Sequence, residues 1–502
     1  MRRIPLALLA GACLALSFQP WNLWFLAIPG VALLTWVVTD LSPAASFGHG
    51  FLAGLVLNYL AIWWVSAQAG PAIHALVVVM ACWVGLAATL TNVLLRLRAP
   101  DLWVPTAWVL VEFGAGTFPF KGFPWLRLGH TVIDQPLAGW LPIIATPGTT
   151  WLVAFLGCLL LRLITSPRRL RPALVGAAVV LVGGLLTLRP IPPADQQVTV
   201  GMVQGNVALD LDTGFIAATG ATPNHLSETV FLLAEARTRG AELDFVVWAE
   251  NSTDRDPLLD ETTRRQVEWS VRLAEVPVLV GAVMVGPEPR TRQTVSLWWT
   301  PAEGITDRYA KRNLAPFGEW VPYRDLIEPL FPDVKRAGAQ SIPGEEPGVM
   351  KVSTPRHGEL RVGTAICYEL AYDQTMSELV WHGAEVLVSQ STTHNFTGTA
   401  EPHQQMAINR VRAAELGREF VATTLNGHSG LIDSRGRVHE PTVEGTAAHR
   451  ILTLPVRDDI TPAAVIGIPI QAFCALASIG GALLGARRSS NLDKPSTRKD
   501  HR

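Results

Sequence analysis

The chain has 502 residues, of which 49% are hydrophobic and only 17% are charged, and its mean hydropathy is +0.27. Soluble globular chains carry about 25% charged residues, so this deficit indicates a membrane protein. The formal net charge of −1 argues against a nucleic-acid-binding protein, which would show a large excess of Lys and Arg.

Long uncharged segments occupy the first part of the chain and return near its end. A run of roughly 20 apolar residues is long enough to cross a bilayer as a helix. We predict eight spans, seven before a polar block and one after it. Buried core helices are the alternative for the shorter ones, above all 102–113. The stronger spans are 20–39, 72–95, 140–161 and 461–486, and the weaker ones are 4–18, 47–66, 102–113 and 172–188.

Lys and Arg are unevenly divided between the two sides of this predicted bundle. Fourteen lie at one set of ends, including both chain termini, whereas the opposite short loops hold only Lys121 and Arg127, with Arg189 at a boundary. Positively charged loops stay in the cytoplasm. Both termini are therefore predicted to be cytoplasmic. The polar block follows an odd number of spans, so it should lie outside.

The chain is thus divided into four parts. We expect a seven-helix transmembrane region at 1–191, an external domain at 192–458, an eighth transmembrane helix at 459–486 and a cytoplasmic polar tail at 487–502. Strands that alternate with helices predict an α/β fold for the external domain. The predicted strands are 198–204, 244–250, 276–284, 360–368, 384–390 and 420–425, and the predicted helices are 222–240, 260–275, 371–382 and 400–417.

Two predicted strands end on chemically reactive side chains, Glu250 and Cys367. Lys311 follows another probable strand, at 305–310, and opens a loop rich in Pro, Gly and aromatic residues at 311–323. Sites in open α/β sheets form beyond the carboxyl ends of the strands. Each residue alone has an ordinary interpretation, as a solvated Glu or Lys or a space-filling Cys. The combination favours a catalytic site.

These three groups suit nucleophilic catalysis. A free thiol has a pKa of about 8.5, so it needs a base, and Glu250 is placed to take its proton. Lys311 and the backbone N–H of Tyr368 would stabilise the oxyanion that develops on the attacked carbonyl. Cys367 is the only cysteine of the external block, so it has no disulfide partner there. No spacing of Cys and His suggests zinc, and no phosphate-binding loop is present, so neither metal nor cofactor is expected.

The order Glu250, Lys311, Cys367 resembles the Glu-Lys-Cys triad of the nitrilase superfamily. Over nearly its whole length the chain resembles the apolipoprotein N-acyltransferase family. The motifs that carry this resemblance are "KGFPWLRLGH" (121–130), "VQGNV" (203–207), "KRNLAPFGEWVPY" (311–323), "ICYE" (366–369) and "HQQMAINRVRAAELGR" (403–418).

The resemblance implies a nitrilase-like α-β-β-α sandwich inserted in an eight-helix transmembrane bundle. Cys367 would be the acylated nucleophile, Glu250 the base and Lys311 the oxyanion stabiliser. Glu319 matches a carboxylate that supports the site, and Tyr368 and Glu369 match positions that flank the nucleophile.

It also implies a reaction. An acyl chain would pass from a membrane phospholipid, through a thioester, to the α-amino group of a diacylglyceryl-cysteine at an apolipoprotein N-terminus. The enzyme would act as a monomer in the cell membrane, without a cofactor and without nucleic acid.

The sequence departs from the family pattern at two places. Ala249 replaces the proline that usually precedes the base, and "SQSTTHNFTG" (389–398) replaces an Asn-Asp-x-Trp-Phe-Gly loop. Substrate access and acyl-chain preference are therefore open. A membrane-anchored amidase is one alternative, because the triad alone does not separate hydrolysis from transfer. A transporter or receptor is another, although few ionisable groups lie in the spans, among them Glu112, His49 and His74.

Overall fold

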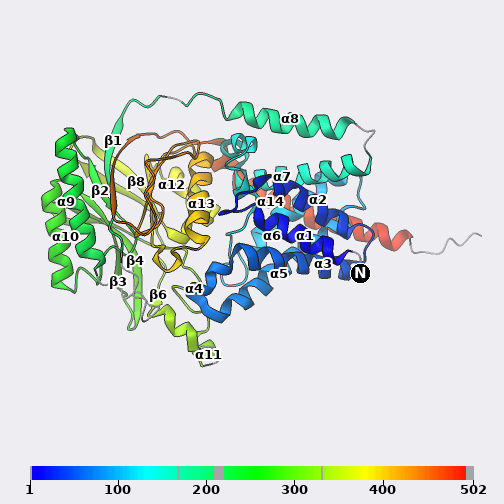
Figure 1. The fold of residues 1–502 in the computed structure, drawn as a ribbon, viewed down its shortest axis with the longest axis horizontal. Coiled ribbons are helices and arrows are strands. Elements are labelled where there is room, and N and C mark those ends of the chain that lie inside the picture. Colours follow the sequence, from blue (N-terminus) through cyan, green and yellow to red (C-terminus); the bar gives the residue numbers. More distant parts are fainter. Residues whose placement is uncertain (1–2, 167–169, 192, 208–219, 330–331, 493–502) are drawn as a thin grey trace, which may run out of the picture.

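The structure, a computed structural model, describes residues 3–166, 170–191, 193–207, 220–329 and 332–492. It has two parts that lie end to end (Figure 1). A β-sandwich flanked by helices forms one part, and a bundle of apolar helices forms the other. Helices α12 (Asp373–Trp381) and α13 (Glu401–Leu416) lie between them.

The bundle is built from apolar segments close to those predicted. Among the described residues, four helical segments are long and apolar enough to cross a membrane: 43–61, 63–94, 136–165 and 462–487. Shorter apolar helices accompany them, so the number of crossings stays a prediction. The helices of this part are α1 (Ile4–Leu16), α2 (Ala27–Val38), α3 (Pro43–Ala61), α4 (Ser66–Ala69), α5 (Ile73–Leu94), α6 (Pro100–Ala115), α7 (Leu141–Thr165), α8 (Leu170–Leu186) and α14 (Pro462–Leu492).

Two helix boundaries differ from the prediction. The segment 20–39 forms a regular helix only from Ala27, because Asn22 has a left-handed backbone (φ 51°) and a 3-10 turn follows it. Helix α14 continues to Leu492, into the predicted polar tail. The rest of that tail, 493–502, lies outside the described residues, as do Arg2, Arg168 and Arg169 of the predicted cytoplasmic side.

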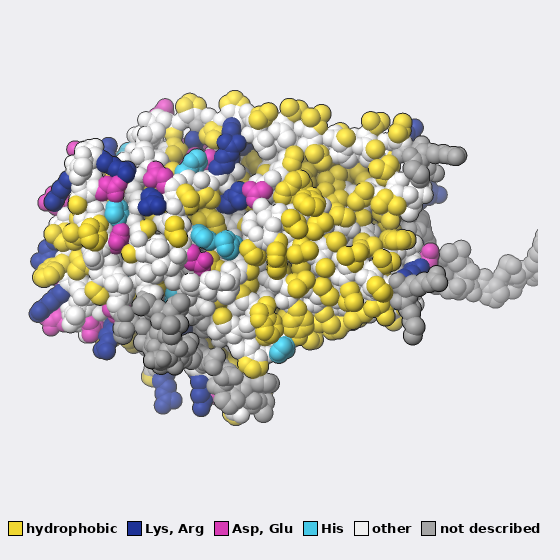
Figure 2. Space-filling view, in the orientation of Figure 1, with side chains coloured by type: hydrophobic (Ala, Val, Ile, Leu, Met, Phe, Trp, Pro, Cys, Tyr) yellow, Lys and Arg dark blue, Asp and Glu magenta, His cyan; other side chains and the backbone are white. Residues whose placement is uncertain are grey.

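The surface reflects the same division. Hydrophobic side chains crowd the bundle side of the molecule, whereas charged side chains gather over the sandwich (Figure 2). Large apolar side chains such as Leu174 and Phe473 are more than 60% exposed on the outward faces of α8 and α14. A continuous apolar surface of this kind is typical of contact with lipid.

The sandwich consists of two mixed β-sheets. Strands β1, β2 and β3 pair in parallel in the first sheet, and β8, β9 and β10 do so in the second. The first sheet has the order β13-β1-β2-β3-β4-β5, with β6 against β4, and the second has the order β12-β11-β10-β9-β8-β7. The strands are β1 (Gln197–Gln204), β2 (Phe245–Trp248), β3 (Val278–Val285), β4 (Thr291–Thr300), β5 (Gly304–Ala310), β6 (Gln340–Ser341), β7 (Val349–Thr354), β8 (Gly358–Ile366), β9 (Val386–Ser391), β10 (Phe420–Thr424), β11 (Gly430–Ile432), β12 (Val438–His439) and β13 (Ala448–Pro455).

Each face of the sandwich is covered by helices. Apolar side chains of both sheets, among them Phe245 and Trp298, pack in the layer between them. Helices α9 (Ala221–Arg239) and α10 (Glu261–Ala274) cover the first sheet, and α12 and α13 cover the second. The predicted α-β-β-α layering is therefore confirmed. The short helix α11 (Arg324–Ile327) lies outside these layers.

The second helical layer also packs against the apolar bundle. One hydrophobic cluster runs without a break from α1 and α2 to α12 and α13. Gln404 on α13 joins the two parts by four hydrogen bonds: its Oε1 accepts from the indoles of Trp64 (2.9 Å) and Trp125 (2.8 Å), and its Nε2 donates to the carbonyls of Gln19 (2.9 Å) and Ala61 (2.8 Å). The sandwich is therefore fixed to the bundle.

A buried ionic network reinforces this junction. Asp373 Oδ1, at the start of α12, lies 2.5 Å from Arg127 Nη1 and 2.8 Å from Arg412 Nη2. Arg412 Nη1 in turn lies 2.6 Å from Glu415 Oε2, which also accepts a hydrogen bond from Thr146 Oγ1 of α7 (3.0 Å). Burial would raise the pKa of Asp373, but the two guanidinium groups outweigh it and hold that pKa below its usual value of 3.8.

We expect Asp373→Asn to destabilise the junction by about 3–5 kcal/mol, because it leaves two buried guanidinium groups without their shared anion. Thermal unfolding of the detergent-solubilised protein measures this. The folded-state pKa of Asp373 is depressed, so its stabilisation is present above pH ~4 and is lost as the pH falls below it. The unfolding temperatures of wild type and variant should therefore converge in acid. Glu261→Gln, in an exposed ion pair with Arg265, should change little; equal effects of both substitutions would contradict the role of the network.

Candidate active site

The predicted catalytic residues all follow the ends of strands. Glu250 comes two residues after β2, Lys311 directly after β5 and Cys367 directly after β8. Strands β2 and β5 belong to the first sheet and β8 to the second. The site therefore forms where the ends of the two sheets meet.

Lys311 is buried between two carboxylates. Its Nζ lies 3.0 Å from Glu250 Oε1 and 2.9 Å from Glu319 Oε1. Lys311 and Glu250 are each only 2% exposed, so the interpretation of either as a solvated surface residue is excluded. The structure thus brings together three of the predicted site residues.

The second oxygen of each carboxylate is held by the backbone. Glu250 Oε2 accepts from the N–H of Thr392 (2.8 Å), and Glu319 Oε2 accepts from the N–H of Ala315 (2.8 Å). Gly281 on β3 packs closely against the turn that carries Glu250. A Cβ atom at position 281 would lie 2.2 Å from the carbonyl oxygen of Ala249. Both carboxylates are therefore fixed in orientation as well as in position.

Cys367 sits at a sharp turn between β8 and the 3-10 helix that follows. Its φ of 52° is in the left-handed region, which costs a non-glycine residue free energy and persists only where the surroundings enforce it. Glu369 supplies that enforcement. Its Oε2 accepts from the N–H of Ile366 (2.8 Å), and its Oε1 accepts from Tyr309 Oη (2.7 Å) and the N–H of Arg312 (2.7 Å). Glu369 thereby joins the Cys367 turn to the segment that carries Lys311.

Burial and the neighbouring charges shift the pKa values of the site residues in opposite directions. Burial alone would lower the pKa of Lys311, but Glu250 and Glu319 outweigh it and raise that pKa well above its ordinary value. Burial raises the pKa of Glu250, which Lys311 lowers only in part. Burial and the charge of Glu250 raise the pKa of Cys367, while Lys311 acts in the opposite direction. The Cys367 thiol thus lies within the electrostatic influence of a carboxylate and an ammonium.

The residues after Cys367 contact the bundle. The hydroxyl of Tyr368 donates to the carbonyl of Gly122 (3.1 Å), and its ring stacks on Trp125 with centroids 6.0 Å apart. Tyr372 Oη donates to the carbonyl of Lys121 (3.1 Å). The segment 121–126 thus lies directly against the turn that carries Cys367.

Sequence reasoning missed a further carboxyl group near the site. Glu401, at the first position of α13, is 2% exposed, and its Oε2 has no hydrogen-bond partner among the described residues. Burial and the charges of Glu250 and Glu444 raise the pKa of Glu401 well above its usual range. An acidic residue in the first turn of a helix is common, because it interacts favourably with the helix dipole, so nothing in the sequence pattern distinguishes this position.

Fold and site together define a membrane-associated protein of the carbon-nitrogen hydrolase class: residues 281–449 match the family described as "Carbon-nitrogen hydrolase". Residues 10–159 match "Apolipoprotein N-acyltransferase N-terminal domain". The chain belongs to the apolipoprotein N-acyltransferase family. It is 31% identical to the apolipoprotein N-acyltransferase of Mycolicibacterium smegmatis over 94% of this chain and 83% of that protein, and 30% identical to that of Azotobacter vinelandii over 87% and 86%.

Solved structures with partial similarity to this chain belong to the nitrilase superfamily. An amidase of the nitrilase superfamily from Nesterenkonia aligns with 54% of this chain and 95% of its own, with a TM-score of 0.38 and 15% identity. A nitrilase-superfamily member from Saccharomyces cerevisiae aligns with 60% of this chain and 97% of its own, with a TM-score of 0.37 and 14% identity.

Glu369→Gln should disturb the Cys367 turn. The amide nitrogen cannot accept, so at least one backbone N–H that Glu369 now satisfies loses its acceptor inside the protein. Such a loss costs about 1–3 kcal/mol. We expect a lower unfolding temperature and slower alkylation of Cys367 by a small thiol reagent. Glu359→Gln, at an exposed position of β8, is the matched control; unchanged stability and alkylation in Glu369→Gln would contradict this role.

Proposed function

We propose that this protein is an N-acyltransferase that moves a fatty acyl chain from a membrane phospholipid, through a thioester on Cys367, to the α-amino group of a diacylglyceryl-cysteine at an apolipoprotein N-terminus. The observation that carries the proposal is the burial of Lys311 between Glu250 and Glu319, beside a cysteine whose turn is hydrogen-bonded to the apolar bundle.

In the first half-reaction, Glu250 takes the proton of the Cys367 thiol. The thiolate attacks the ester carbonyl carbon of the phospholipid, and Lys311 with the backbone N–H of Tyr368 stabilises the oxyanion. The bond from this carbon to the glycerol oxygen breaks. Glu250 returns the proton to that oxygen, so a lysophospholipid leaves and the acyl group remains on Cys367.

In the second half-reaction, the acceptor amine attacks the thioester carbonyl. Glu250 accepts a proton from the attacking nitrogen, the carbon–sulfur bond breaks, and Glu250 returns this proton to the Cys367 thiolate. The products are an amide on the lipoprotein and the free enzyme. Glu319 orients Lys311 throughout and takes no proton in this scheme.

A group of aromatic side chains close to Glu319 in the sequence and in contact with one another supports a lipid donor. Phe120, in the loop after α6, makes edge-to-face contacts with Phe317 and with Tyr323, which is 75% exposed. Phe317 lies two residues from Glu319. An acyl chain that follows these rings stays out of water, and each CH₂ kept buried is worth roughly 0.8 kcal/mol.

The alternatives find less support. An amidase of the same class would need no attachment of its nucleophile turn to the bundle. A transport path would need ionisable groups that face a polar passage. Glu112 instead accepts from the backbone N–H of Leu128 (2.8 Å) and from Thr150 Oγ1 (2.7 Å), which is a structural role.

We place the protein in the cell membrane as a monomer, with eight crossings, both termini in the cytoplasm and the sandwich outside. The basic residues of the predicted cytoplasmic side support this arrangement. Arg96 follows α5, and Arg162 lies in the last turn of α7, where its Nη1 is 2.7 Å from Asp101 Oδ2 at the start of α6. The chain's N-terminus lies at the end of the bundle away from the sandwich (Figure 1).

Incubation of the purified protein with phospholipid should raise its intact mass by one fatty acyl group, and neutral hydroxylamine should remove that group, because a thioester forms on Cys367. Glu250→Gln should abolish the mass shift by loss of the base. Lys311→Ala should slow it by the 10²–10³-fold that is typical for loss of one oxyanion donor. Cys367→Ser with an unchanged hydroxylamine-labile adduct would contradict the proposal.

The proposed orientation is tested separately. A membrane-impermeant thiol reagent, applied to intact cells with any outer envelope opened, should label Cys367 in the unacylated enzyme. The other cysteines lie in α1, α5, α7 and α14 and should stay largely unlabelled. Cys367→Ser is the control for the assignment of the label. Labelling of Cys367 only after the membrane is broken would put the sandwich in the cytoplasm.

A further inference from the structure

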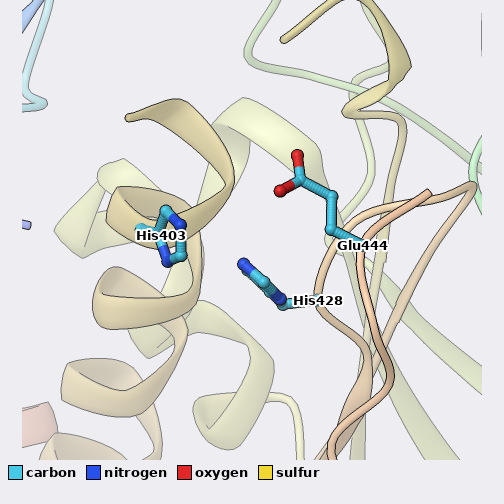
Figure 3. Close-up of side chains that lie close together, drawn as sticks. All are labelled: His403, His428 and Glu444. Atoms are coloured by element: carbon cyan, nitrogen blue, oxygen red, sulfur yellow. The ribbon is translucent and has the colours of Figure 1, made fainter. Parts of the chain in front are cut away.

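Two histidines and a glutamate from separate segments converge at one side of the catalytic sandwich. His403 lies in the first turn of α13, His428 in the loop between β10 and β11, and Glu444 in the loop between β12 and β13. One ligand atom of each lies within 4.8 Å of those of the other two. Figure 3 shows both rings and the carboxylate gathered around one space.

The donor atoms of this His403–His428–Glu444 cluster are available. His428 Nε2 is buried and has no hydrogen-bond partner among the described residues. The other nitrogen of that ring interacts with the backbone of Thr442, which fixes the ring's orientation. Glu444 Oε1 accepts from the N–H of Gly398 (2.9 Å), so its second oxygen can serve as a ligand. A hydrogen bond that orients a ligand from behind is typical of metal sites.

Among the residues that the structure describes, no other group of His, Cys, Asp and Glu side chains offers this arrangement. His449 lies between two carboxylates, but its Nδ1 is 2.5 Å from Glu228 and its Nε2 is 2.6 Å from Glu235, so both ring nitrogens are occupied. His439 Nε2 is paired with Asp433 at 2.9 Å. The His403–His428–Glu444 cluster is therefore distinguished by an unpartnered, buried ring nitrogen, which faces a second imidazole and a carboxylate.

We propose that His403, His428 and Glu444 bind a divalent transition-metal ion of the zinc type. Two imidazoles and one carboxylate form a donor set that zinc uses when a fourth position stays open for water. Ligand atoms of a tetrahedral zinc site lie about 3.4 Å apart, given bond lengths near 2.1 Å. Small side-chain rotations bring the three donors from their present separations to this distance, and exposed His403 has the freedom to make them.

Such an ion would join three segments, of which the loops that carry His428 and Glu444 already share backbone hydrogen bonds, from the N–H of Gly445 to the carbonyl of Asn426 (2.7 Å) and from the N–H of Thr442 to the carbonyl of Ser429 (2.9 Å). It would tie the first turn of α13 to the loops that carry His428 and Glu444. Through Glu444 and Gly398 it would also restrain the segment 389–398, whose Thr392 N–H holds Glu250. The ion would thus hold these segments together next to the catalytic site, without contact with the reacting atoms.

Equilibrium dialysis of tag-free, EDTA-treated full-length protein against ZnCl₂ tests this site. We expect one zinc ion per chain, a higher unfolding temperature with zinc than without, and visible absorption bands of tetrahedral Co²⁺ when cobalt replaces zinc. His428→Ala and Glu444→Gln should each weaken zinc binding at least about tenfold. The matched control His439→Ala, which removes another histidine of the same sheet, should bind as wild type does.

Cys367 offers a thiolate to the same ions, so the two sites must be separated. Zinc binding and the thermal shift should persist in Cys367→Ser and disappear in His428→Ala. Binding that is lost in Cys367→Ser and kept in His428→Ala would place the ion on the nucleophile and overturn the proposal. The absence of bound zinc in the wild type, or equal binding by His428→Ala and wild type, would overturn it as well.

Discussion

The buried ammonium of Lys311 is the constraint around which the catalytic end of this protein is arranged. A charged group taken out of water needs a partner, and here it has two carboxylates. Strands β2 and β5 are not neighbours, since β3 and β4 lie between them. Glu250 and Lys311 can therefore meet only because both lie past the strand ends, where the backbone is free to turn across the edge of the sheet.

Removal of one carboxylate would leave Lys311 paired with the other, whereas removal of Lys311 would leave two buried carboxylates without their shared cation. Burial raises the pKa of Glu250, while the charge of Lys311 acts in the opposite direction. A raised pKa makes a carboxylate a better proton acceptor. The stability cost of the buried charges and of the left-handed Cys367 is offset by the packing of the sandwich layers and by the hydrogen bonds of Glu369.

Much of the fold follows from local sequence patterns, and much of the site does not. Apolar runs that are long enough to cross a bilayer predict helices by themselves. The β-branched runs of β1, β9 and β10 predict buried strands. Strand β7 was not predicted, because only Met350 and Val352 bring apolar side chains to its buried face, which is too short an alternation to indicate a strand. Glu250 and Cys367 were found because each ends a predicted strand, and Lys311 because it follows one. Glu401 and the His403–His428–Glu444 cluster depend on which loops meet in space, and no sequence spacing encodes that.

The chemistry of a Glu-Lys-Cys site is compatible with both hydrolysis and transfer, so the surroundings must separate them. A thioester survives long enough to meet an amine only where water reaches it slowly. Cys367 is half-buried, and Tyr368 next to it contacts Gly122 and Trp125 of a loop between two apolar helices. Phe120 and Tyr323, which contact each other, add to that apolar surface. In the proposed reaction, the chains of a lipid-bearing acceptor would gain contacts on this surface that water lacks. Attachment of the Cys367 turn to the apolar bundle is thus the feature that would favour acyl transfer over hydrolysis in the proposed function.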